Sequence, residues 1–247
     1  MATCSEATEE VNEPGAAPYG NFRNYYTFNP PENRLSLIPA TLLRDLGHND
    51  DQDDVTLVLD VGCNSGELSV AFYNHVVQQP EVATHKKKVH LLGFDLDETL
   101  IQRAQEINPL HSSITFLHLD ITKNMGQLQD YLRQRCCSHF HLCLCLAVTM
   151  WVHLNHGDAG LLQLLSQLAS ISQHLLLEAQ PWKCYRSAAR RLRKLGRSDF
   201  DHFKTLKIRG DVAEHAREHL ERHCDMQLIQ SFGSTTWDRQ LLLFRRK

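Results

Sequence analysis

A buried strand that ends in a glycine-containing turn constrains the fold more than any other feature of this sequence. Residues 55–62 read VTLVLDVG, and the turn DVGCNSG (60–66) leads directly into a helical pattern. Gly62 allows a tight turn that brings backbone close to a ligand, and Gly66 permits close contact between helix and strand. A strand–turn–helix unit of this kind is typical of α/β folds that bind ligands outside the carboxyl ends of their strands.

The rest of the chain continues the alternation of strand and helix patterns. We expect further strands at residues 89–95, 114–120, 140–147 and 174–180, and helices at 67–79, 98–107, 122–135 and 157–173. After a basic helix and a helix near 211–223, the strands MQLIQSF and QLLLFRR are expected to pair antiparallel. This alternation predicts the α/β fold class, with a seven-stranded, mostly parallel, Rossmann-like sheet and helices on both faces.

The length and composition predict one domain. Single hydrophobic cores stop growing at roughly 250–300 residues, and the chain has 247. Residues 1–18 are acidic and small, which predicts a disordered leader, and residues 19–247 are expected to form a single domain. That domain opens with an aromatic segment (19–47), followed by a charged turn (48–54).

The cysteine pattern and the hydropathy limit the function classes. None of the eight cysteines is spaced as CxxC, so we expect no metal site. The sequence has no 18-residue apolar run and opens without a secretory signal, so we expect no membrane partner and a reducing, intracellular location. These features do not separate cytosol from nucleus; of the two, we expect the cytoplasm.

Carboxylates end three successive predicted strands, at Asp60, Asp95 and Asp120. An acidic side chain at the second strand end can accept both ribose hydroxyls of a nucleotide. Asp120 can bind an adenine amino group while Ile121 covers the ring. Asn64 stands where a dinucleotide fingerprint needs glycine, which favours a methionine-bearing nucleoside over a pyrophosphate. A nicotinamide or flavin site, or a simple strand–helix turn, remains an alternative.

Three longer strings carry a family resemblance. They are YGNFRNYY…NPPENRL (19–35), TMWVHLNHGDAGL (149–161) and LLLEAQPWKCY (175–185). With the strand-end acids they resemble the Bicoid-interacting family of RNA methyltransferases, over about residues 14–246. The resemblance implies a class I methyltransferase that uses S-adenosyl-L-methionine and releases S-adenosyl-L-homocysteine. It implies transfer to an oxygen of an RNA 5′-monophosphate, with histidine tRNA and precursor microRNA as substrates, and makes an RNA-processing protein a candidate partner.

The cofactor site is expected at Gly62 of the turn and, by motif match to this family, at Arg34, Asn64, Asp95, Asp120, Ile121 and Leu146. Two predicted loops, 151–158 and 180–183, follow the fourth and fifth strands on the same edge of the sheet. The candidates to hold the phosphate during catalysis are His153, His156 and Lys183. Such histidines are otherwise caps or surface residues, and such a lysine is otherwise solvated.

A basic run at residues 185–197 predicts a helix with one cationic face. Arg186, Arg190, Arg193 and Arg197 are four, three and four residues apart, so they share that face. The net charge of the chain is −3, so any RNA contact must be a local patch such as this one, unless the face is merely solvated.

The remaining candidate RNA contacts are Tyr19, Arg23 and Trp182. The aromatic residues of the segment either stack on a terminal base or cover the core. Two rival functions remain: a methyltransferase for a protein or small molecule, and an RNA-binding module without turnover.

Overall fold

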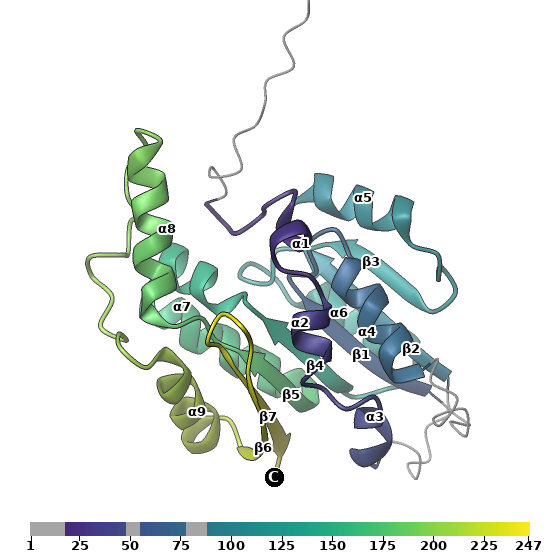
Figure 1. Ribbon diagram of the computed structural model, residues 1–247. Coiled ribbons are helices and arrows are strands. Elements are labelled where there is room, and N and C mark those ends of the chain that lie inside the picture. The colour runs from purple at the N-terminus through teal and green to yellow at the C-terminus, as the bar shows by residue number, and fades with distance from the viewer. Residues whose placement is uncertain (1–17, 48–54, 78–87) are drawn as a thin grey trace, which may run out of the picture.

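The computed structural model describes residues 18–47, 55–77 and 88–247 (Figure 1). The predicted leader, apart from Pro18, and the turn predicted at 48–54 lie outside these residues, so the division into leader and domain stays a prediction. The first described segment forms three short helices: α1 (Tyr25–Phe28), α2 (Glu32–Leu35) and α3 (Leu42–Asp45).

The strands and longer helices alternate as predicted. The strands are β1 (Val55–Val61), β2 (Lys88–Asp95), β3 (Ile114–His118), β4 (Phe140–Leu146), β5 (Ser172–Glu178), β6 (Met226–Ser234) and β7 (Gln240–Arg246). The helices are α4 (Glu67–Val77), α5 (Glu98–Ile107), α6 (Gly126–Gln134), α7 (Thr149–Ile171), α8 (Trp182–Lys194) and α9 (Val212–His223).

The described residues form one seven-stranded sheet in the order β3-β2-β1-β4-β5-β7-β6. β1 to β5 pair parallel, while β7 runs antiparallel to both of its neighbours, β5 and β6. The direction of winding reverses between β1 and β4, which is where α/β sheets of this type bind their ligands.

Helices cover both faces of the sheet, as Figure 1 shows. Successive residues of a strand point to opposite faces. In β1, Leu57 and Leu59 join the core beneath α6 to α9, whereas Val58 joins the core beneath α3 to α5. This three-layer arrangement leaves the strand ends between β1 and β4 open to a ligand.

The predicted loop at residues 151–158 is wrong, because these residues belong to α7. Gly157, with φ 71° and ψ −173°, kinks the helix at the point where it had been expected to begin. The run had suggested a loop because it is rich in Asn, His and Gly. Met150, Val152 and Leu154 are nevertheless buried against the sheet, and this packing overrides the weak local propensity.

In the described part of the chain, no helix has the length and apolar character needed to cross a membrane.

Candidate functional site

A cavity of about 660 Å³ lies at the carboxyl ends of the central strands. All of the residues predicted to hold the cofactor line it: Arg34, Gly62, Asn64, Asp95, Asp120, Ile121 and Leu146. They come from α2, from the ends of β1, β2 and β4, and from the loop after β3, which the parallel topology brings to one edge. The walls also include Tyr25 and Tyr26 of α1 and Trp151 of α7, which the sequence had not singled out for the cofactor.

Asp95 organises the loop that follows β1. Its Oδ2 accepts a hydrogen bond from the backbone N–H of Asn64 (3.0 Å), and its Oδ1 accepts one from the N–H of Asp97 (3.0 Å). Burial raises the pKa of Asp95, and the backbone N–H donors partly oppose that shift. Each carboxylate oxygen has further acceptor capacity for a ribose hydroxyl.

The Asn64 side chain does not point its donor at the cavity. Its Nδ2 donates to the carbonyl of Phe22 (3.1 Å), and its Oδ1 accepts from the backbone N–H of Ser65 (2.8 Å). Asn64 also has φ 53°, a left-handed conformation that asparagine tolerates better than most residues. Asn64 therefore lines the cavity while its amide fastens the segment that covers it.

Asp120 lines the cavity from the loop after β3. Its Oδ1 accepts from the backbone N–H and the hydroxyl of Thr122, and its Oδ2 pairs with Lys123 Nζ (3.1 Å). Burial raises the pKa of Asp120, but the hydrogen bonds from Thr122 and Lys123 outweigh it and lower the pKa. Asp120 is therefore an ionised acceptor near neutral pH.

A buried ionic network that the sequence did not predict supports Arg34. Glu178, at the end of β5, accepts from Arg34 Nε and Nη2 and from Arg239 Nη1. Tyr25 Oη accepts from Arg34 Nη2 (2.9 Å). Burial alone would lower the pKa of Arg34, but Tyr25 and Glu178 outweigh it and raise the pKa, so the guanidinium stays charged.

Arg34 still has an unused donor at the cavity. Its side chain is 1% exposed, and Nη1 has no hydrogen-bond partner among the described residues. A buried donor without a partner is costly unless a ligand satisfies it. Asp60 lines the same cavity, and burial raises its pKa to about 7 despite a hydrogen bond from Ser69. The cavity therefore offers an anion-binding donor next to a carboxyl that is partly protonated at neutral pH.

The structure separates the three residues predicted to be catalytic. Only His156 lines the cavity. Lys183 lies outside the cavity lining, in an exposed ion pair with Asp238 (2.9 Å).

His153 is fully buried, with Nε2 2.8 Å from Asp158 Oδ1 and Nδ1 3.0 Å from Tyr185 Oη. Burial lowers the pKa of His153, although Asp158 opposes that shift. The neutral ring donates from Nε2 to the carboxylate and accepts at Nδ1 from Tyr185. Asp158 in turn accepts from the backbone of Lys207 and Ile208. His153 therefore joins α7 to α8 and to the segment before α9, and it is not among the residues that line the cavity.

The residues predicted to contact RNA fall into three groups. Tyr19 lines the cavity. Trp182 already stacks on Tyr185 (4.9 Å between centroids) and Phe203 (5.6 Å), with the Arg209 guanidinium over its ring, so its place is that of a packing anchor. The cations are exposed: Arg23, Arg186, Arg190 and Arg193.

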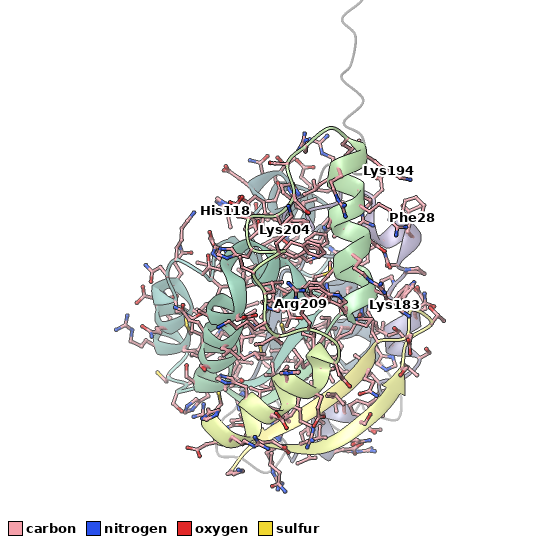
Figure 2. The ribbon with its side chains drawn as sticks, turned by 90° about the vertical axis from the view of Figure 1, so that its left-hand side faces the viewer. Phe28, His118, Lys183, Lys194, Lys204 and Arg209 are labelled. Carbon is pink, nitrogen blue, oxygen red and sulfur yellow. The ribbon has the colours of Figure 1, made fainter. Side chains whose placement is uncertain are left out.

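Figure 2 shows α8 with two of its lysines labelled. Lys183 and Lys194 lie toward the two ends of the helix, and Lys204 and Arg209 lie on the segment that follows it. Tyr185, Ala188 and Leu192 form the buried face of the same helix, so Arg186, Arg190 and Arg193 lie on the face turned to solvent. The helix ends at Lys194 and Gly196 follows with φ 66°, so Arg197, which was predicted to share that face, lies beyond the helix. Among the described residues, no group of three or more His, Cys, Asp or Glu side chains could hold a metal ion.

Known proteins resemble this chain in sequence and in fold. The family model of Bicoid-interacting protein 3 (Bin3) matches residues 140–246. The pre-miRNA 5′-monophosphate methyltransferase of Danio rerio is 63% identical over 245 residues, which cover 97% of this chain and 96% of that protein. The RNA 5′-monophosphate methyltransferase of Homo sapiens is 47% identical over 251 residues, which cover 99% of this chain and 86% of that protein.

A solved structure confirms the predicted fold class. Magnesium protoporphyrin IX methyltransferase from Synechocystis PCC 6803, with bound SAM, superposes with a TM-score of 0.52 at 15% identity, covering 91% of this chain and 85% of that one. An identity this low supports the class I methyltransferase fold alone. The high identity to the Danio rerio protein along nearly all of both chains, together with the matching family model, shows that the chain belongs to the Bicoid-interacting protein 3 (Bin3) family.

Proposed function

We propose that the protein transfers a methyl group from S-adenosyl-L-methionine to an oxygen of an RNA 5′-monophosphate. The observation that carries the proposal is the convergence of seven predicted cofactor residues on one cavity beside a cationic helix. The names of the relatives from Danio rerio and Homo sapiens support the same reaction and acceptor.

The residues of the cavity fit S-adenosyl-L-methionine. Arg34 has a buried Nη1 donor without a partner, which suits the carboxylate of the methionine end. Asp95 offers acceptors for the ribose hydroxyls, and Asp120 offers an acceptor for the adenine amino group, with Ile121 beside the ring. When bound, this cofactor supplies a methyl group on a positively charged sulfur.

The acceptor needs little acid–base help from the protein. A terminal phosphate has a second pKa of about 6, so at neutral pH its oxygen is already deprotonated. The residues at the cavity therefore have to position the phosphate and exclude competing acceptors. Tyr19 and His156 line the cavity and can do both.

The exposed arginines of α8 provide a track for the RNA backbone. Arg186 and Arg190 lie on the solvent face of the helix, which Figure 1 shows extending past the sheet. Contacts from such residues position a nucleic acid without reading its sequence. Lys183 at the start of the helix would join this track once it leaves Asp238.

The test uses one RNA sequence prepared with a 5′-monophosphate, a 5′-triphosphate or a 5′-hydroxyl end. We expect transfer of labelled methyl to the monophosphate well above the triphosphate, and none to the hydroxyl, because only the first presents an unhindered ionised terminal oxygen at the required place. Mass spectrometry locates the methyl group, and Asp95→Ala serves as the cofactor-site control.

Equal labelling of all three ends, or a methyl group on an internal base, would contradict the proposed acceptor. Label in a protein or small-molecule fraction would favour the first rival function. Binding of RNA without any transfer would favour a module that has lost turnover.

The proposal extends to the identity of the RNA substrates, the cellular location and a protein partner. Histidine tRNA and precursor microRNA are the proposed RNAs, the cytoplasm is the proposed location, and an RNA-processing protein is a candidate partner. A competition assay between the two RNAs at equal concentration ranks them, and fractionation of cells that express the tagged chain tests the location.

A further inference from the structure

Residues 18–28, here called the strap, form part of the wall of the cavity. Tyr19, Gly20, Tyr25 and Tyr26 of the strap line it. The strap contacts α7 and α8 on one side, and the loop after β1 and the start of α5 on the other. It therefore bridges two parts of the fold that are otherwise joined through the sheet.

On one side the strap packs against α7 and α8. Asn155 Nδ2 donates to the carbonyl of Pro18 (3.0 Å). A Cβ at Gly20 would lie 2.3 Å from the Trp151 indole, so the strap backbone lies directly on that ring and only glycine fits. The Phe22 ring and the same indole pack edge to face, with their centroids 5.8 Å apart, and the Arg191 guanidinium lies 5.3 Å from the Phe22 centroid.

On the other side the strap is fastened to the cofactor loop and α5. Asn21 Nδ2 donates to Asp97 Oδ2 (2.7 Å), and Asn64 Nδ2 donates to the carbonyl of Phe22. Asp97 is also the N-cap of α5, since its Oδ1 accepts from the backbone N–H groups of Thr99 and Leu100. One carboxylate thus caps a helix with one oxygen and holds the strap with the other.

Both fastenings lead back to Asp95. Its Oδ2 accepts from the N–H of Asn64, and its Oδ1 accepts from the N–H of Asp97. The two residues that Asp95 orients through their backbones therefore both hold the strap with their side chains. Arg103 of α5 adds a third bond, from Nη1 to the carbonyl of Arg23 (3.1 Å). A ligand that binds the Asp95 carboxylate contacts the centre of this arrangement.

We infer that the strap is a clamp that couples the two ligand sites, with Asn21, Asn64 and Asp97 as positioning residues. Cofactor bound at Asp95 stabilises the loop that fastens the strap, and the fastened strap places Tyr19 in the cavity wall where the RNA end enters. The assignment of the two ligands rests on the proposed function. By linkage, cofactor then tightens RNA binding by the same factor by which RNA tightens cofactor binding.

A swap of donor and acceptor tests the clamp. Asn21→Asp places a carboxylate against Asp97 and breaks the bond. Asp97→Asn keeps a good N-cap for α5, and Asn21 can turn its Oδ1, which has no partner among the described residues, toward the new amide. The double variant N21D/D97N restores one donor and one acceptor with their places exchanged. Asn24→Asp, an exposed position on the same strap without a capping bond, is the matched control.

Two measurements read the coupling without turnover. Hydrogen exchange of residues 18–28 is followed with and without S-adenosyl-L-homocysteine, and the affinity for a 5′-monophosphorylated RNA hairpin is measured in both states. In the wild type we expect slower exchange and RNA binding tighter by about 5-fold or more, the lower end of typical coupling. N21D should lose both effects, whereas D97N, N21D/D97N and N24D should keep them.

The inference fails if the strap of N21D is protected by S-adenosyl-L-homocysteine as strongly as that of the wild type, or if N21D/D97N behaves like N21D. Failure of the proposed function looks different. In that case the hairpin does not bind or accept methyl in any variant, while hydrogen exchange still reports whether the ligand at Asp95 fastens the strap.

Discussion

Asp95 is the residue where the loss of a single side chain should most directly remove the cofactor. Asp95→Ala removes an ionised acceptor, and hydrogen bonds to charged groups contribute roughly 1.5–3 kcal/mol, so affinity should fall at least 10-fold. Titration calorimetry with S-adenosyl-L-homocysteine measures the change, and circular dichroism shows whether the variant is folded. Unchanged affinity in a folded Asp95→Ala protein would remove this residue from the site.

Asp60 should make stability depend on pH. Its pKa rises from 3.8 to about 7 in the folded protein because the side chain is buried. Between these values the folded chain retains a proton that the unfolded chain has released, so the free energy of unfolding falls as pH rises, by up to about 1.4 kcal/mol per unit. Urea unfolding at pH 5 and pH 7.5 should show a smaller fall for Asp60→Asn than for the wild type. Identical falls would mean that Asp60 does not titrate in this range.

At the scale of elements, α8 should act as a salt-sensitive track. Arg193 donates to the carbonyl of Ala189 and pairs with Asp199, so its substitution would also remove contacts within the protein. Arg186 and Arg190 are therefore the better positions for testing RNA contacts. We expect R186E/R190E to weaken RNA binding and to flatten its dependence on salt, since fewer counterions are released. Binding of S-adenosyl-L-homocysteine should not change. Arg222→Glu on α9 is the control, and the same salt slope for the double variant and the wild type would reduce α8 to a solvated face.

Most of the elements follow from local sequence patterns, with two exceptions: α8 begins at Trp182, inside the predicted loop at 180–183, and α7 includes the predicted loop at 151–158. The bounds of α5 equal the predicted residues 98–107, because apolar positions repeat with helical spacing and Asp97 caps the start. The beginning of α7 was not predictable in this way. Local composition there favours a loop. The segment is helical because Met150 and Leu154 are buried, and this burial depends on the tertiary structure.

The residues of the cofactor site could be predicted from the sheet topology, whereas the ion pairs that hold Arg34 and Lys183 could not. Carboxyl ends of parallel strands meet at one edge, so Asp95 and Asp120 had to gather there. The pairing of Arg34 with Glu178 joins residues 144 positions apart, and no local signal marks it. Lys183 looked available for a phosphate because its partner Asp238 lies 55 positions away, on the turn between β6 and β7.

At the scale of the whole molecule, Glu178 at the end of β5 connects the first described segment with the hairpin of β6 and β7. Glu178→Gln leaves Arg34 and Arg239 without their shared anion, and removing one partner of a buried pair typically costs 3–5 kcal/mol. We expect a loss of unfolding free energy of about that size, together with weaker binding of S-adenosyl-L-homocysteine. Urea unfolding measures the first and calorimetry the second. Glu218→Gln, in an exposed pair on α9, should change neither, and a wild-type midpoint for Glu178→Gln would show that the network is not needed.

The position of β7 has a consequence for synthesis on the ribosome. β7 follows β6 in the chain yet lies inside the sheet, between β5 and β6. Until it emerges, β6 has no strand to pair with, and β5 exposes an open edge that other nascent chains can join. Glu178 follows Arg34 by 144 residues, and Arg239 follows Glu178 by 61 residues. At translation rates of about 5–20 residues per second, Glu178 is therefore synthesised on the order of ten seconds after Arg34. During this interval the nascent chain is a natural client for chaperones, and the ionic network that supports Arg34 is complete only once Arg239 has emerged.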